Sequence, residues 1–186
     1  MTRRNYVIAL ILIVSGVLIM FKMPEVQTST FPPVRKGMGL LDRRDLIIWN
    51  NLRLALCERS ETFCASLWYG EMTKEKYDNA LSLLSKVERD EWERLSRISL
   101  QRSRAGVAPQ ECTKEDFNRG IREIFPTLSN VDLEKLKLAL HLQERSTPED
   151  AAFAMKTILR NSHLTPELRE RFIRFLALHP QEIERE

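Results

Sequence analysis

Three cysteines and three histidines are the side chains best suited to metal or covalent chemistry in this chain of 186 residues. Their spacing forms no Cys-x2-Cys, His-x3-His or His-Glu-x-x-His pattern. His141, His163 and His179 stand singly near expected helix ends, where an imidazolium would offset the helix dipole. A Cys–His catalytic pair would need the fold to assemble it. We therefore expect no metal site and no cofactor.

The cysteines predict a disulfide instead. In an oxidising compartment, Cys57, Cys64 and Cys112 should form one bridge and leave one thiol. Three pairings exist, and Cys57–Cys64 is favoured because a helix is expected to end between these two residues. On one continuous helix they would lie about 10 Å apart, which is too far for a bond.

Other catalytic signatures are absent from the sequence. It has no Gly-rich phosphate loop and no Gly-x-Ser-x-Gly elbow. Carboxylates are plentiful but dispersed over expected solvent faces, so they indicate no acid–base pair. The sequence therefore favours a non-enzymatic protein.

The charge distribution excludes nucleic acid as an expected partner. The net charge of +3 resides entirely in residues 1–22, on Arg3, Arg4 and Lys22. Removing these three from the 29 basic residues leaves 26, which equals the number of acidic residues. A neutral remainder lacks the basic footprint of a polyanion binder.

Residues 6–21 predict a transmembrane helix, because they are almost wholly apolar and contain no charge. Their helical length of about 24 Å is short for a bilayer core, and Arg4 and Lys22 can snorkel to close the gap. A cleaved signal peptide is the alternative, but no small-residue cleavage site follows. The flanking Arg3 and Arg4 favour a cytoplasmic N-terminus.

The remainder of the chain is then extracytoplasmic. Because it contains no Asn-x-Ser/Thr acceptor, a bacterial envelope is favoured. We expect a single-pass inner-membrane protein with an anchor at 1–23, a linker at 24–40 and a periplasmic domain at 41–186. The linker contains three prolines and two glycines, and it forms either an extended stalk of about 50 Å or a strip packed on the domain.

Helical periodicity continues from there to the end of the chain. The first helix should begin near Asp42 or Asp45 and end at 57–59. Residues 60–72 are expected to be irregular and aromatic-rich. One long helix of thirty-odd residues should follow Thr73, with a length near 48 Å, and two chains could pair through it. The predicted fold is therefore all-α, with a transmembrane helix, a Pro-containing linker and a helical domain.

Two candidate interaction surfaces lie in this region. The first is the aromatic cluster of Phe63, Leu67, Trp68 and Tyr69, which is either an exposed binding patch or a cap on the hydrophobic core. The second is a basic run at the end of the long helix, made up of Arg94, Arg97, Arg102 and Arg104. It either meets an anionic partner or compensates the helix dipole.

A loop at 105–112, a candidate sub-boundary, precedes about four short helices. Their expected starts are Thr113, Ser129 or Asn130, Thr147 and Thr165, each with acids in the first turn. We expect them to form a compact four-helix subdomain. Its expected core residues are Phe117, Ile121, Ile124, Leu133, Leu136, Leu140, Phe153, Met155, Ile158, Leu159, Leu168, Phe172, Ile173, Phe175 and Leu176.

These features predict a membrane-anchored, non-enzymatic helical protein-interaction module of the cell envelope. Its role would be in assembly, as a scaffold or as an accessory subunit, with envelope proteins as partners. Two alternatives stay open. One is an envelope enzyme acting on cell wall or lipid, which would need a deep polar cleft. The other is an immunity or inhibitor protein.

Overall fold

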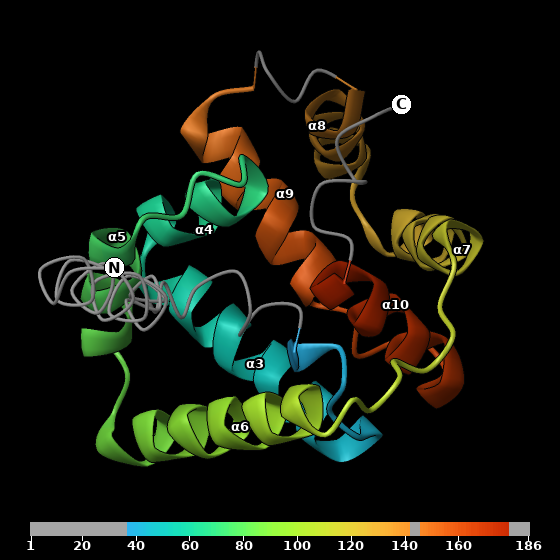
Figure 1. The fold of residues 1–186 in the computed structure, drawn as a ribbon. Coiled ribbons are helices and arrows are strands. Elements are labelled where there is room, and N and C mark those ends of the chain that lie inside the picture. Colours follow the sequence, from blue (N-terminus) through green and yellow to red (C-terminus); the bar gives the residue numbers. More distant parts are fainter. Residues whose placement is uncertain (1–36, 142–145, 179–186) are drawn as a thin grey trace, which may run out of the picture. The chain divides into compact units, whose positions relative to one another are not determined.

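Every regular element in the described part of the chain, residues 37–141 and 146–178 of the computed structural model, is a helix. In chain order these are α3 Arg43–Arg59, α4 Glu61–Trp68, α5 Lys74–Ser82, α6 Lys86–Arg104, α7 Lys114–Ile124, the short 3-10 helix η1 Phe125–Thr127, α8 Asn130–His141, α9 Pro148–Leu159 and α10 Pro166–Leu178. The all-α prediction is confirmed for these residues (Figure 1).

No helix within these two ranges is both long and apolar enough to cross a bilayer. The predicted transmembrane segment at 6–21, its flanking Arg3, Arg4 and Lys22, and the linker up to residue 36 lie outside the described residues.

Side-chain caps set most helix starts where the sequence predicts them. Asp42 accepts a hydrogen bond from the backbone N–H of Asp45 at 2.9 Å, which opens α3. Thr113 forms a complete capping box with Asp116. Thr147 caps α9 through its hydroxyl, which accepts from the N–H of Asp150. Each cap satisfies a backbone donor that the first helical turn leaves unpaired.

Residues 60–72 contain a helix, so the prediction of an irregular region is wrong. Ser60 ends α3, since its N–H donates to the carbonyl of Leu56. The same residue begins α4, because its hydroxyl accepts from the N–H of Phe63 at 3.1 Å. One residue therefore serves both helices, and no loop separates them.

The single long helix is also a wrong prediction. The chain forms α5 and α6 instead, with a break between Ser82 and Lys86. A capping box causes the break: the N–H of Ser85 donates to Glu88, and the Ser85 hydroxyl accepts from the N–H of Glu88. Arg59 holds the corner by donating to Glu88 at 2.7 Å and to the Leu83 carbonyl. At 19 residues, α6 is about 28 Å long.

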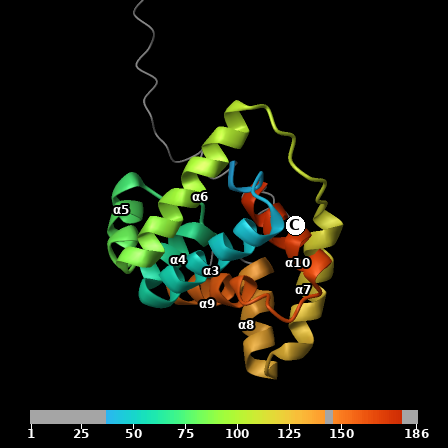
Figure 2. The same ribbon diagram turned by 90° about the horizontal axis from the view of Figure 1, so that it is seen from below.

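Helices from both sides of the 105–112 loop share one core. Helix α3 lies between α6 and α9 (Figure 2), and α9 also packs on α4 and α8. The C-terminal helices therefore pack against the N-terminal ones and do not form a separate four-helix subdomain. Their expected core residues are buried, except that Leu133, Leu140 and Phe153 are half-buried.

Helices α7 and α10 meet at a close aromatic contact. The ring of Phe117 stacks on Phe172 at 5.2 Å between ring centroids and on Phe175 at 5.3 Å. Gly120 permits this approach, because a Cβ atom there would collide with the Phe172 ring. A glycine that weakens an isolated helix therefore improves packing between two helices.

Glu88 should stabilise the α5–α6 corner in a pH-dependent way. Hydrogen bonds from Arg59 and Ser85 lower the pKa of Glu88 from 4.5 to about 2. A lowered carboxyl pKa stabilises the fold above the unfolded value, and this stabilisation is lost as pH falls from 4.5 towards 2. We expect Glu88→Ala to reduce the free energy of unfolding by about 1 kcal/mol at pH 7, with a smaller difference at pH 3.

Glu93→Ala is the matched control for this measurement by urea denaturation. Glu93 lies on the same helix, is 61% exposed and approaches Arg97 only to 3.8 Å. It should change stability by less than about 0.5 kcal/mol. Equal losses in the two variants would contradict a capping role for Glu88.

Candidate functional site

The predicted aromatic surface is buried, so its interpretation as an exposed binding patch is wrong. Phe63, Leu67 and Trp68 are at most 9% exposed and belong to the main hydrophobic core. Tyr69 is half-buried, and its hydroxyl donates to the carbonyl of Ser146 at 2.6 Å. Helix α4 presents these side chains to the core, as the alternative interpretation expected.

The predicted arginine surface is largely neutralised within the fold. Arg94 donates to Glu91 at 2.8 Å and to Asp45 at 2.6 Å, and these bonds raise the pKa of Arg94. Arg102 donates to the carbonyl of Leu40 at 2.8 Å. Arg94 attaches α6 to the first turn of α3, and Arg102 attaches it to the segment just before α3. These two arginines therefore do not form a surface for an anionic partner.

The other two arginines are separate from this attachment. Arg97 is 68% exposed and lies 3.8 Å from Glu93 on its own helix. Arg104 is exposed in the last turn of α6, where a positive charge complements the helix dipole.

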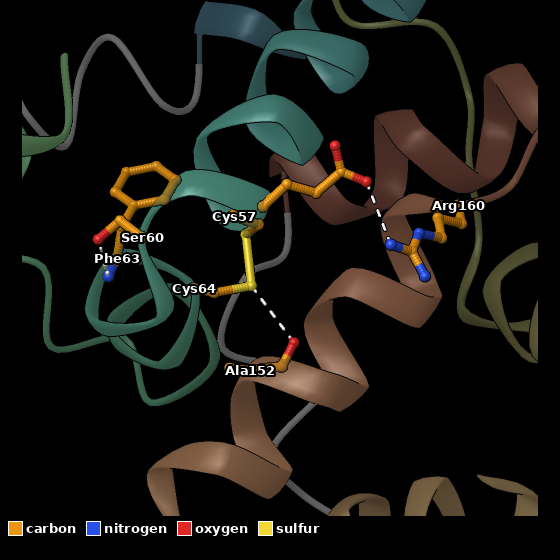
Figure 3. The surroundings of a disulfide bond; sticks show 7 residues. Cys57, Ser60, Phe63, Cys64, Ala152 and Arg160 are labelled. Atoms are coloured by element: carbon orange, nitrogen blue, oxygen red, sulfur yellow. Dashed lines mark hydrogen bonds and ion pairs between the residues drawn. A yellow bond between two sulfur atoms is a disulfide. The ribbon is translucent and has the colours of Figure 1, made fainter. Parts of the chain in front are cut away.

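The structure brings the predicted pair, Cys57 and Cys64, to disulfide distance. Cys57 near the end of α3 and Cys64 in α4 have Cα atoms 4.7 Å apart and are joined through their sulfur atoms. Both are fully buried, and the Cys64 sulfur lies 3.4 Å from the Ala152 carbonyl oxygen of α9 (Figure 3). The bridge therefore lies inside the α3–α4–α9 contact. Cys112 has a free thiol whose pKa is raised by burial.

A buried ionic network, which we call the entry clamp, holds the segment that leads into α3. It comprises Arg174 and Glu170 of α10, Arg43 of α3, and the carbonyls of Gly39 and Leu41. Arg174 is 1% exposed and donates to both carbonyls, at 3.0 Å for Leu41, and to Glu170 at 2.8 Å. Arg43 donates to the other Glu170 oxygen at 2.5 Å.

The charges in the entry clamp compensate one another. Burial pushes the pKa of Glu170 upward, but hydrogen bonds from Arg43 and Arg174 outweigh burial, and the pKa is lowered. Glu170 is therefore an anion that balances the buried guanidinium. Pairing of this kind is needed because an isolated buried charge costs several kcal/mol.

The entry clamp also bears on the two alternatives for the linker. Met38 and Leu41 are each 1% exposed, and the N–H of Leu40 closes a turn on Gly37. The last residues of the linker, 37–40, are thus a strip packed on the domain. Sequence reasoning missed this contact, although a charged residue within the apolar run around Arg174 is the pattern that could have indicated it.

One exposed apolar surface is prominent among the described helices. Val131 and Leu138 of α8 are 67% and 51% exposed and line a shallow groove. The groove is also lined by the polar residues Glu134, Lys135, Lys137 and His141 of α8. We call these six residues the α8 outer face. On the opposite side of the helix, Leu136 and Ala139 are fully buried.

A second, polar groove lies between α7 and α10. Two arginines line it, Arg119 and Arg171. Their guanidinium nitrogens lie 2.9 and 3.5 Å from a carboxylate oxygen of Asp116. Burial raises the pKa of Asp116, but hydrogen bonds from Thr113 and the nearby arginines bring the net pKa below its usual value. The two arginines of the groove are therefore paired with a carboxylate that also takes part in the capping box of α7.

Neither groove assembles catalytic groups. In the described parts of the chain, no set of histidine, cysteine and carboxylate side chains is arranged to hold a metal ion. The buried polar contacts are structural: Asn50 donates to the Leu159 carbonyl at 2.9 Å, and Asn161 accepts from Arg169 at 2.9 Å. The α8 outer face is thus the candidate site, and it suits binding better than chemistry.

No protein-family model matches the chain, and comparisons with curated proteins and with solved structures likewise find no match.

Removing the Arg174 charge should destabilise the fold strongly. Arg174→Met leaves two buried carbonyls without their donor and Glu170 with one cation fewer, so we expect a loss of about 3–5 kcal/mol in urea unfolding. Arg174→Lys keeps the charge but cannot reach all three acceptors, and it should lose about 1–2 kcal/mol. Arg171→Met, at a 56% exposed position of the same helix, should lose less than about 1 kcal/mol. A loss in Arg174→Met no larger than in this control would refute the entry clamp.

Thiol mapping tests the bridge. Non-reducing mass spectrometry of the purified chain should find one free thiol, at Cys112, and Cys57 joined to Cys64. Replacing both bridge cysteines by serine should lower the free energy of unfolding by about 2–3 kcal/mol, because the short closed loop no longer restricts the unfolded chain. Cys112→Ser is the control, with little change expected. Two or more free thiols in the native chain would refute the pairing.

Proposed function

We propose that the protein is a membrane-anchored, non-enzymatic helical interaction module of the cell envelope. The observation that carries this proposal is the α8 outer face, an apolar surface with a charged border on an otherwise well-packed helical domain. Surfaces of this composition suit protein partners. The partner we propose is an envelope protein, and the association serves assembly or scaffolding.

The proposed location rests on the sequence. The apolar stretch at 6–21, preceded by Arg3 and Arg4, would anchor the chain in the inner membrane with its N-terminus in the cytoplasm. The domain would then be periplasmic. A disulfide between Cys57 and Cys64 fits an oxidising compartment of this kind.

The entry clamp supports an anchored role. It fixes the backbone at Gly39 and Leu41 to α10, through Arg174. A chain that leaves the membrane would therefore join the domain at one defined point.

Site-specific crosslinking in native membranes tests this function. A photoreactive amino acid at Val131 or at Leu138 should form adducts with a protein of the envelope, since both side chains are exposed. The same amino acid at Val87, a 78% exposed valine of α6, is the matched control and should form at least about tenfold less adduct. Equal labelling from all three positions, or none from α8, would contradict the proposal.

The same membranes test the topology. After permeabilisation of the outer envelope, external protease should digest the domain at 41–186. Protection of that domain would overturn the periplasmic location while leaving the adducts from α8 to be judged separately.

A further inference from the structure

The exposed apolar residues of α8 form one stripe. Val131 and Leu138 are seven residues apart, or two helical turns, so they lie on the same side of the helix. Glu134 and Lys135 occupy the intervening turn and are also exposed. A stripe of two apolar side chains with charges between them matches a single helix lying alongside α8.

The charges of α8 are divided along its length. On the α8 outer face, the acidic Glu134 comes first along the helix, and the basic Lys135 and Lys137 follow it. An occupant with a matching face should therefore be basic beside the start of α8 and acidic beside its end. The α8 helix itself has this order when its direction is reversed.

We propose that the α8 outer face binds the same face of a second copy of this chain, with the two α8 helices antiparallel. This inference rests on the proposed function and specifies its partner. A two-fold axis between Glu134 and Lys135 would place Val131 level with Leu138 of the second copy. Glu134 of each helix would then face Lys135 of the other, as in an isologous interface.

Other arrangements on α8 are less favourable. A parallel pairing would bring Glu134 and Lys135 next to their own copies, and like charges repel. In the antiparallel pairing, Lys137 can exchange its 2.9 Å bond to Glu134 of its own helix for a carboxylate of the second copy. The exchange costs little, because the pair is solvent-exposed and weak.

Helix α6 offers no comparable stripe, although the sequence predicts pairing through the long helix that contains it. Its exposed apolar residues, Val87 and Leu100, are thirteen residues apart, so they lie on different sides of the helix. A single helix face is also a small interface. We therefore expect weak association that a shared membrane would strengthen through high local concentration.

Disulfide crosslinking of the full chain in membranes tests the pairing. One tagged version would carry Val131→Cys, and a second version with a different tag would carry Leu138→Cys. Both would also carry Cys112→Ser, which removes the native thiol. Mild oxidation should crosslink one tagged version to the other. Self-crosslinking of either version should be at least about tenfold lower, because two identical positions would lie about 10 Å apart along the axis.

Two controls complete the experiment. A Val87→Cys version, exposed on α6, should not crosslink to either α8 version. Adding Lys135→Glu and Lys137→Glu to both tagged versions should reduce the mixed crosslink about tenfold, since acidic side chains would then face one another. Deleting residues 179–186 should leave the mixed crosslink unchanged.

Three results would overturn the inference. Preferential self-crosslinking of the Val131→Cys version would indicate parallel helices. Crosslinking only after deletion of 179–186 would indicate that this segment of the same chain covers α8. Absence of any mixed crosslink, with photoadducts still formed to a different protein, would reject self-pairing and leave the proposed function standing. Absence of both would reject the two together.

Discussion

The buried guanidinium of Arg174 is the constraint on which the arrangement of the domain depends. A cation with 1% exposure must recover the hydrogen bonds that it loses with water, or the fold cannot tolerate it. Arg174 does so on Glu170 and on the carbonyls of Gly39 and Leu41. These partners belong to α10 and to the segment before α3, so one electrostatic requirement joins distant parts of the chain.

The contacts of α9 with its neighbours are mainly apolar. Helix α9 is surrounded by α3, α4 and α8, and its buried alanines, such as Ala152, allow close approach. The disulfide lies in this contact and restrains the corner between α3 and α4. Because α8 covers α9 with one side only, Val131 and Leu138 on its other side are exposed.

The polar side chains of the domain are used mainly for attachment. Arg94 reaches Asp45, Arg59 reaches Glu88, and Arg102 reaches the Leu40 carbonyl. Although 30% of the residues in the chain are charged, these three arginines do not form a basic surface, because their partners lie within the fold. It also distinguishes the α8 outer face, whose charges border exposed apolar residues.

Local chemistry in the sequence was sufficient for several elements. Asp42, Thr113 and Thr147 start helices because a side-chain acceptor beside unpaired N–H groups acts within three residues. The Cys57–Cys64 pair was predictable because a helix end between two nearby cysteines lets the chain turn back. The all-helical class followed from apolar periodicity.

Other features depend on residues distant in the sequence, and only the tertiary structure reveals them. The corner between α5 and α6 is held by Arg59 from another helix, although the break itself has a local signal in the sequence, the Ser85–Glu88 capping box. Whether aromatic residues such as Trp68 form a surface or a core depends on which helix covers them. Burial, and the pairing of Arg174 with Gly39, 135 positions away, are properties of contacts distant in sequence, so no local pattern identifies the partners.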